Sequence, residues 1–490
     1  MLGIIVEKAW STRSEVTVKV RLTCPAATGG YFTMPEQHKR VACQIAGLAP
    51  AVLYFFVAAA LASYAFLWPS NNWDVLPYAG VIASWQTSDA DAIHRDAYAS
   101  IGGLPEYAVL VGTGPVSEFK HDIFSDSIHF VQQLPFYSIK PLYCLLLAGL
   151  HRLGFSFPQS MAITSVCSFV ILCVLTWFWL RRYLTQSQSM AFAALLVISP
   201  PIYTVARLAS PDALGLMLFA LALYLFLESS HVVTGATILL VTLWVRPDSL
   251  ILTGFLFCVL LLLKKIDFAE WFTFCAMALL SYCVIRVFAG PYSWSVLFHN
   301  SFIAALTAPG NAIVKVTPQT YFFTIAQNGW TLLKSTSLTL VFLMGLLALM
   351  LHRRRSYRFM TATILLSEIL HFVMYPSIEH RFYTLSTFFF PLSLVLACKK
   401  YFPRQGRCAW STGEMSNDSL GMKEVEAEAL GTKVAAFEPR YSGSSAERTT
   451  SLLEATSNYS DCKVQSRCRT IRAKLAVPTA SASMTTLPFD

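Results

Sequence analysis

A series of ten apolar runs, most of them long enough to cross a lipid bilayer, constrains the fold of this chain more than any other feature. The runs cover residues 45–68, 162–180, 187–206, 210–227, 231–245, 248–263, 268–287, 329–350, 357–375 and 382–398. A helix of about 20 apolar residues spans the hydrocarbon core of a bilayer. Apolar residues make up 55% of the chain and charged residues only 13%, which excludes one water-soluble globule. We therefore expect an all-α integral membrane protein with about ten transmembrane helices.

The basic clusters at the ends of these runs predict the orientation of the chain. They are His38–Arg40, Arg181/Arg182, Lys264/Lys265, Arg353–Arg355 with Arg358, and Lys399/Lys400. Lys and Arg concentrate at the cytoplasmic ends of membrane helices, and one topology places all five clusters inside. Both termini are then cytoplasmic. The apolar segment 140–155 could be an eleventh span, but that would move the four later clusters outside, so we expect an interfacial helix there.

This topology divides the chain into three parts. Residues 1–44 form a cytoplasmic N-terminal segment. Residues 45–400 form the membrane domain, with a large first outer loop over 69–161 that contains interfacial helices. Residues 401–490 are rich in Ser, Thr, Glu and Lys, which predicts a disordered cytoplasmic tail. The net charge of +9 reflects membrane orientation, so we expect membrane lipid as a partner and no nucleic acid.

Polar residues that interrupt the apolar pattern lie almost entirely at the predicted outer ends. The first outer loop begins with Asp74 and ends with Lys140, and later outer turns contribute Arg207 with Asp212, Arg246 with Asp248, and His380 with Arg381. Ionisable residues near a bilayer are costly and usually functional. The twelve Cys are scattered without CxxC or Cys/His spacing, so we predict no zinc site and propose no metal, and metal dependence stays open at this point.

Carboxylates and fixed cations on one membrane face suit the transfer of a sugar from a lipid-linked phosphate to a hydroxyl. The acceptor hydroxyl loses a proton as it attacks, so a carboxylate must act as general base. The leaving phosphate needs cations where its negative charge develops, and Arg provides a rigid fork of donors for this. The lipid tail of the donor would explain the membrane setting.

The arrangement resembles the GT-C fold glycosyltransferases, which use polyprenyl- or dolichyl-phosphate sugars. The resemblance covers about residues 45–400 and rests on Asp74 just after the first span, the large outer loop, Lys140-Pro141-Leu142-Tyr143, and the segments around Arg207, Arg246 and Arg381. The lysine-proline stretch looks like that of the lipid A aminoarabinose transferase branch, which is related to protein O-mannosyltransferases. The resemblance implies an inverting glycosyltransferase that needs no further cofactor. The acid-acid dipeptide that many members carry after the first span is missing here.

These observations predict a functional role for each outer polar residue, and each residue also has a purely structural alternative. Asp74 is the candidate catalytic base, and its alternative is a solvated loop carboxylate. Lys140, Arg207, Arg246, His380 and Arg381 are candidates for binding the donor phosphate. Arg207 and Arg246 could instead form structural ion pairs with Asp212 or Asp248, which we expect to orient the cations.

Two other classes of function remain open at this point. A multi-pass transporter or flippase for a lipid-linked or anionic substrate would show an inverted internal repeat and midplane polar residues, neither of which the sequence displays. A non-catalytic scaffold would tolerate substitution of Asp74 and Arg246. The predicted function is transfer of a sugar from a polyprenyl-phosphate donor at the periplasmic or lumenal face. A bacterial inner membrane is the expected location, with the ER as the alternative, and the acceptor is unidentified.

Overall fold

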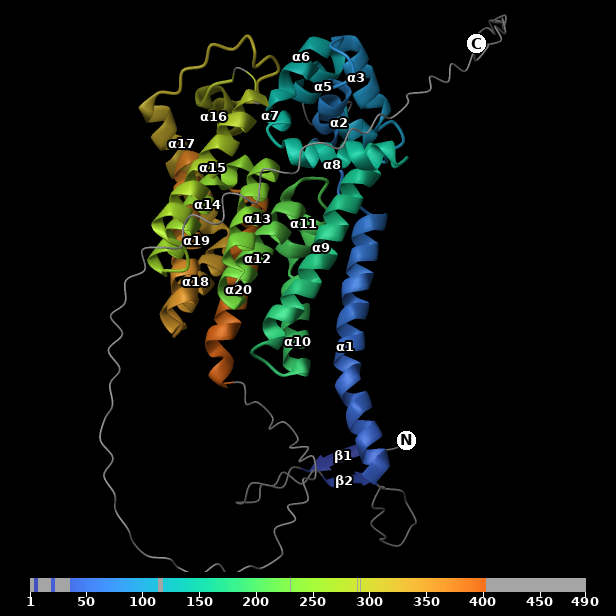
Figure 1. The fold of residues 1–490 in the computed structure, drawn as a ribbon. Coiled ribbons are helices and arrows are strands. Elements are labelled where there is room, and N and C mark those ends of the chain that lie inside the picture. The colour runs from blue at the N-terminus through green and yellow to red at the C-terminus, as the bar shows by residue number, and fades with distance from the viewer. Residues whose placement is uncertain are drawn as a thin grey trace, which may run out of the picture. The chain divides into compact units, whose positions relative to one another are not determined.

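The computed structural model describes residues 4–7, 19–22, 36–112, 118–229, 231–288, 290 and 292–401 (Figure 1). Beyond Tyr401 the expected cytoplasmic tail lies outside the described residues, as does most of the expected N-terminal segment 1–44. Within that segment, β1 (Ile4–Glu7) pairs antiparallel with β2 (Lys19–Leu22), with Ile4 opposite Leu22. The described remainder is helical, which confirms the predicted all-α class for the membrane region.

The helices follow one another with short connections. In chain order, the first are α1 (Glu36–Leu67), α2 (Val75–Ala83), α3 (Ala90–Ala99), α4 (Tyr107–Leu110), α5 (Glu118–Ser125), α6 (Ser127–Gln133), α7 (Pro135–Ser138), α8 (Pro141–Arg152), α9 (Phe157–Arg181), α10 (Gln186–Ile198), α11 (Pro200–Arg207), α12 (Asp212–Glu228), α13 (Val232–Val245), η1 (Pro247–Ser249), α14 (Leu250–Leu262) and α15 (Phe268–Phe288). They are followed by α16 (Trp294–Phe302), α17 (Pro318–Lys334), α18 (Thr336–Leu351), α19 (Arg355–Met374), η2 (His380–Tyr383), α20 (Thr384–Ala397) and η3 (Cys398–Tyr401).

Three helices are long and apolar enough to cross a membrane by length and composition, namely α1 from Ala49 to Leu67, α9 and α15. The count rises to five if two bent pairs each form one span: α10 with α11, bent by 61°, and α17 with α18, bent by 84°. Helices also occupy the other predicted runs, but they are shorter or carry more charge. These apolar helices suggest a membrane-embedded protein.

The two bends correct the predicted runs 187–206 and 329–350, which are not straight helices. The first break falls at Ser199, and Pro200 and Pro201 follow at the start of α11. A proline lacks the N–H that a continuous helix needs but fits a first turn, so a new helix begins there. The second break falls at Ser335 between α17 and α18. Hydrophobicity alone does not reveal either change of direction.

The predicted outer loop 69–161 folds into a helical layer of its own. Helices α2 to α8 lie at one end of the longer helices, and α8 runs across that end (Figure 1). This layer has a separate apolar core, with buried Tyr78, Phe130 and Tyr143 among its largest side chains. Segment 140–155 is thus a helix beside the bundle's end, as expected. This layer, which we call the outer layer, brings Asp74 and Lys140 to the ends of the long helices.

Capping residues explain where two of the long helices begin. Ser156 accepts a hydrogen bond from the backbone N–H of Gln159, whose side chain accepts one from Ser156 in return. Thr185 and Gln188 repeat the arrangement at the start of α10. Such reciprocal bonds satisfy N–H groups that a first helical turn leaves without partners. The turns at both ends of α9 therefore have local sequence causes.

Candidate functional site

A cavity of about 450 Å³ lies between the outer layer and the ends of the long helices. Six of its lining residues are charged: Asp74, Lys140, Asp212, Arg246, Asp248 and Arg381. Its other walls carry aromatic side chains: Trp73, Phe119, Phe136, Tyr137, Tyr282, Trp294, Tyr375 and Phe382. Residues up to 307 positions apart in the chain are in direct contact here. The structure thus brings these six residues from distant parts of the chain to one cavity.

Asp74 is held by three hydrogen-bond donors from different parts of the chain. The carboxylate accepts hydrogen bonds from Arg381 Nη1 at 2.9 Å, from the Asn72 amide at 3.1 Å and from the Tyr137 hydroxyl at 3.2 Å. Asp74 precedes α2 but makes no capping bond with it, and the residue is only 8% exposed. Its side chain is therefore directed to the cavity rather than used to start the helix. The alternative of a solvated loop carboxylate does not describe this residue.

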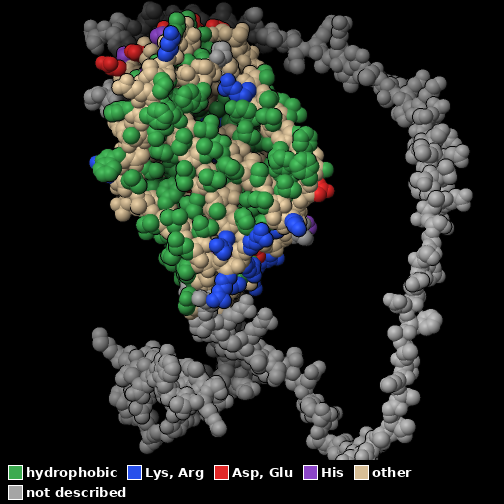
Figure 2. All heavy atoms as spheres, turned by 90° about the vertical axis from the view of Figure 1, so that its left-hand side faces the viewer, with side chains coloured by type: hydrophobic (Ala, Val, Ile, Leu, Met, Phe, Trp, Pro, Cys, Tyr) green, Lys and Arg blue, Asp and Glu red, His purple; other side chains and the backbone are tan. Residues whose placement is uncertain are grey.

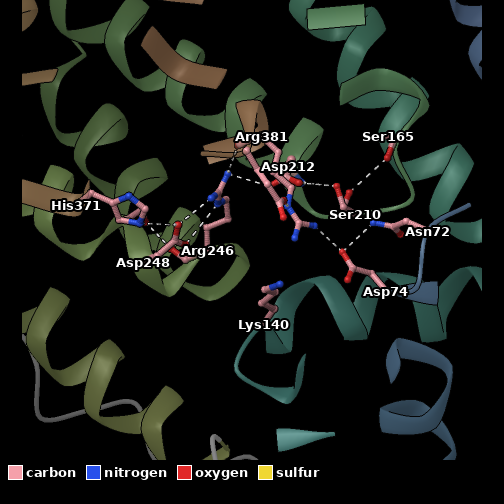
Figure 3. A network of polar contacts seen from close by, with 12 residues as sticks. Asn72, Asp74, Lys140, Ser165, Ser210, Asp212, Arg246, Asp248, His371 and Arg381 are labelled. Carbon is pink, nitrogen blue, oxygen red and sulfur yellow. Dashed lines mark hydrogen bonds and ion pairs between the residues drawn. The ribbon is translucent and has the colours of Figure 1, made fainter. Parts of the chain in front are cut away.

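Arg246 links two carboxylates. Its Nη1 lies 2.8 Å from Asp212, and its Nη2 lies 2.8 Å from Asp248 (Figure 3). Ser210 donates a further hydrogen bond of 2.7 Å to Asp212. The side chains of Arg246 and Asp212 are buried, whereas that of Asp248 is 36% exposed to the cavity. The predicted structural alternative, an ion pair with Asp212 or Asp248, is thus present with both acids at once.

Lys140 differs from the two guanidinium groups in its surroundings. Its Nζ donates a hydrogen bond of 2.7 Å to the Tyr78 hydroxyl and lies 5.3 Å from the centre of that ring. Among the described residues, no carboxylate oxygen lies within ion-pair distance of this ammonium group. The guanidinium groups of Arg246 and Arg381, in contrast, each have a carboxylate oxygen within 2.9 Å. The Lys140 ammonium group therefore contacts a phenol hydroxyl and aromatic rings, whereas Arg246 and Arg381 contact carboxylates. Of these three cations, Lys140 has the positive charge with the least neutralisation by nearby acids.

Burial shifts the protonation of several groups at the cavity. It lowers the pKa of Lys140, and the charges of Asp74 and Asp212 partly offset this effect. Burial followed by the charge of Asp74 raises the pKa of Tyr137 well above its usual value, so its hydroxyl stays protonated and donates. Burial alone would lower the pKa of Arg381, but Asp74 and other acids raise it overall. Arg381 is therefore charged at every ordinary pH.

Arg207 does not line this cavity, which corrects its predicted place among the phosphate ligands. Its Nε donates a hydrogen bond of 3.0 Å to the backbone oxygen of Trp68, and its guanidinium group lies 5.1 Å from the centre of the Tyr64 ring. The structural alternative for Arg207, an ion pair with Asp212 or Asp248, is also absent from the contacts that the structure describes, where both acids pair with Arg246. The residue has the predicted depth along the bundle, but α11 turns its side chain toward α1.

His380 is the second predicted ligand that lies elsewhere. Its ring is exposed and its Nε2 lies 3.4 Å from Ser337 Oγ at the start of α18, outside the residues that line the cavity. The neighbouring Arg381 contacts Asp74 instead, because successive side chains diverge in the tight helical turn η2. Only one residue of this pair therefore belongs to the site.

Sequence reasoning missed three residues that contribute to the cavity. Tyr137 bonds to Asp74, His371 lies 3.9 Å from Asp248, and Tyr375 lines the wall beside it. His371 had a recognisable signal, because it is an ionisable residue near the end of the apolar run 357–375. Tyr137 had none, since aromatic residues are common at membrane interfaces for other reasons.

The donors in this cavity suit an anion rather than a metal ion. Arg and Lys nitrogens bind phosphate oxygens, whereas the carboxylates are already bonded to guanidinium groups. Among the residues that the structure describes, no group of three His, Cys, Asp or Glu side chains is placed to hold a metal ion. Searches of protein-family models, curated proteins and solved structures find no match to this chain.

Proposed function

We propose that the protein is an integral-membrane glycosyltransferase that moves a sugar from a polyprenyl-phosphate donor to an acceptor hydroxyl on the outer face. One observation carries the proposal: a buried carboxylate and three cations line a single cavity at one end of an apolar helical bundle. A carboxylate can accept the proton that the acceptor loses, and cations can stabilise the phosphate that leaves. A lipid-linked donor would reach such a cavity from the bilayer.

The contacts of Arg381 support a specific order of events. Without donor, this guanidinium group lies 2.9 Å from an Asp74 oxygen and occupies it. The donor phosphate competes for Arg381 and also contacts Lys140, the least compensated cation. Asp74 then takes the acceptor proton as the acceptor oxygen forms a bond to the sugar's anomeric carbon. The bond from that carbon to the phosphate oxygen breaks, its electron pair stays on the phosphate, and direct displacement inverts the anomeric centre.

Arg246 has a positioning role in this scheme. Its single positive charge faces two carboxylates, those of Asp212 and Asp248. It is therefore not available to bind a phosphate before the donor enters the site. Asp212 holds it from the buried side, while the exposed side of Asp248 leaves room for one Arg246 nitrogen to turn toward the donor. Asp212 and Asp248 therefore orient the cation, in the role that the sequence predicts for them.

The proposed function also implies a number of spans, an orientation and a membrane. We propose ten spans in a GT-C-like fold, with both termini in the cytoplasm and the cavity on the periplasmic or lumenal face. The outer layer, lying at the same end as the cavity, supports this arrangement (Figure 1). The basic residues at the other end support the same orientation through the preference of Lys and Arg for the cytoplasmic side. A bacterial inner membrane remains our proposed location.

The test compares wild type with Asp74→Asn in detergent, using a panel of prenyl-phosphate sugars. We expect one donor to be turned over by wild type, and a rate about 10²- to 10⁴-fold lower in the variant because the base is lost. Asp96→Asn is the matched control, since Asp96 is an exposed carboxylate of the same outer layer. Equal rates for wild type and Asp74→Asn would refute the assigned base. Binding of a donor without any turnover would favour a flippase or transporter.

A further inference from the structure

The end of the bundle away from the cavity carries an excess of basic residues, which we call the basic end. Figure 2 shows Lys and Arg side chains gathered there, below a broad apolar surface. The group consists of Arg181, Arg182, Lys264, Lys265, Arg353, Arg354, Arg355, Arg358 and Lys399. Glu228, Asp267 and Glu270 are the acids of the described helix ends beside it. Cations therefore exceed acids at this surface.

Glu228 is the buried acid of this end, and one carboxylate faces several cations there. Its side chain is only 5% exposed and accepts hydrogen bonds from the hydroxyls of Tyr183 and Tyr357. Arg182 completes this buried group at 3.5 Å. The carboxylate thus ties the ends of α9, α12 and α19 together.

Two of the outer cations converge on one aromatic ring. The guanidinium group of Arg354 lies 4.8 Å from the centre of the Tyr183 ring, and Lys399 Nζ lies 4.7 Å from it. Arg354 also donates a hydrogen bond of 2.5 Å to the Tyr183 hydroxyl. Tyr183 lies in the α9–α10 turn, Arg354 immediately precedes α19, and Lys399 lies in η3. An anion bound beside this ring would be attracted by both positive charges.

A buried histidine stands beside these cations without a hydrogen-bond partner. His352 is 6% exposed, stacks on Tyr357 at 4.5 Å, and neither ring nitrogen has a partner among the described residues. Burial, with Arg354 and Lys399 nearby, lowers its pKa to about 4, so the ring is neutral at pH 7. A buried polar group without a partner costs free energy that a bound ligand can recover.

We propose that Arg354, Lys399 and His352 form a binding site for the phosphate group of an anionic phospholipid of the inner leaflet. The two cations bind the phosphate, the neutral imidazole supplies one hydrogen bond, and the exposed apolar side chains of the neighbouring helices contact the acyl chains. Leu351 and Phe268 are such exposed residues at this level of the bundle. Basic pockets at the cytoplasmic ends of membrane helices bind anionic headgroups for the same physical reason. This site does not depend on the proposed glycosyl transfer.

Native mass spectrometry of the purified full-length protein tests the proposal, with phosphatidylglycerol and phosphatidylcholine as probes. Each cation near an anionic headgroup contributes about fivefold in affinity. We expect Arg354→Gln combined with Lys399→Gln to weaken phosphatidylglycerol binding about 30-fold. The matched control combines Arg181→Gln with Arg355→Gln, which removes the same charge from residues that stack on other rings, those of Trp177 and Phe359. We expect less than about a fivefold effect from this control.

A second variant guards against misfolding of the first. His352→Phe keeps the stacking on Tyr357 and both cations but removes the ring nitrogens, and we expect about fivefold weaker binding. Equal losses in the control and the Arg354/Lys399 pair would overturn the proposal, because only net charge would then matter. Equal binding of phosphatidylcholine would overturn it as well. Competition by glycerol 3-phosphate at equal strength would assign the site to a soluble phosphate instead.

Discussion

Replacement of Arg246 by Met tests the geometry of the cavity without any assumption about its reaction. The substitution keeps a long unbranched side chain but leaves the charge of Asp212, which is 5% exposed, with the Ser210 hydroxyl as its one hydrogen-bond donor among the side chains that the structure describes. Loss of one member of a buried ion pair costs about 3–5 kcal/mol, because the remaining charge is buried without compensation. Asp248 adds little to this cost, since water reaches its partly exposed carboxylate. We therefore expect a loss of about 3–5 kcal/mol in the free energy of unfolding.

The double variant Arg246→Met with Asp212→Asn makes the reasoning sharper. It removes the buried charge together with its partner, and the amide oxygen introduced by Asp212→Asn can still accept the Ser210 hydrogen bond. We expect it to be about 2–3 kcal/mol more stable than Arg246→Met alone, a coupling within the range for residues in direct contact. Reversible unfolding in mixed micelles, followed by tryptophan fluorescence, measures each variant.

An exposed pair provides the control for this comparison. Arg95 lies 3.9 Å from Asp96, and their side chains are 72% and 63% exposed. Arg95→Met should change the free energy of unfolding by less than about 0.5 kcal/mol, as is usual for surface substitutions. If Arg246→Met were equally mild, or if adding Asp212→Asn failed to recover stability, the buried ion pair described above would be refuted.

Three further predictions concern individual residues around the cavity. Burial lowers the pKa of Lys140, so donor affinity should fall with rising pH below the value near 10.4 where a free lysine titrates, and Lys140→Arg should shift that fall to higher pH in a binding titration. Tyr137→Phe removes a 3.2 Å hydrogen bond to Asp74 and should slow turnover about threefold to tenfold, with unchanged turnover contradicting the contact. Gly215→Ala places a methyl group 2.8 Å from Arg246 Cδ and should destabilise the protein by about 1–3 kcal/mol in the same unfolding assay, whereas Gly254→Ala meets no atom within 4 Å and should be neutral or stabilising.

The sequence determined which segments are helical, which of them are apolar and which polar residues lie at the ends of the apolar helices. Hydropathy and basic clusters report position along the bundle axis, because the bilayer imposes a separate free-energy cost at each depth. Asp74, Lys140, Arg246 and Arg381 were recognisable on this basis. The pairing of Arg246 with an acid was also predictable, since Asp248 follows it two residues later in the chain.

Only the tertiary structure decided which way each side chain turns around that axis. Arg207 lies at the predicted depth, yet its contacts are with Trp68 and Tyr64 rather than with the cavity. Rotation of a helix depends on how its whole surface packs against its neighbours, and this information is spread over contacts between distant residues. The same cause explains why Tyr137 and His371 join the site. The position of a residue along the bundle axis follows from its own segment of the sequence. Which residues line the cavity depends on how the helices pack against one another.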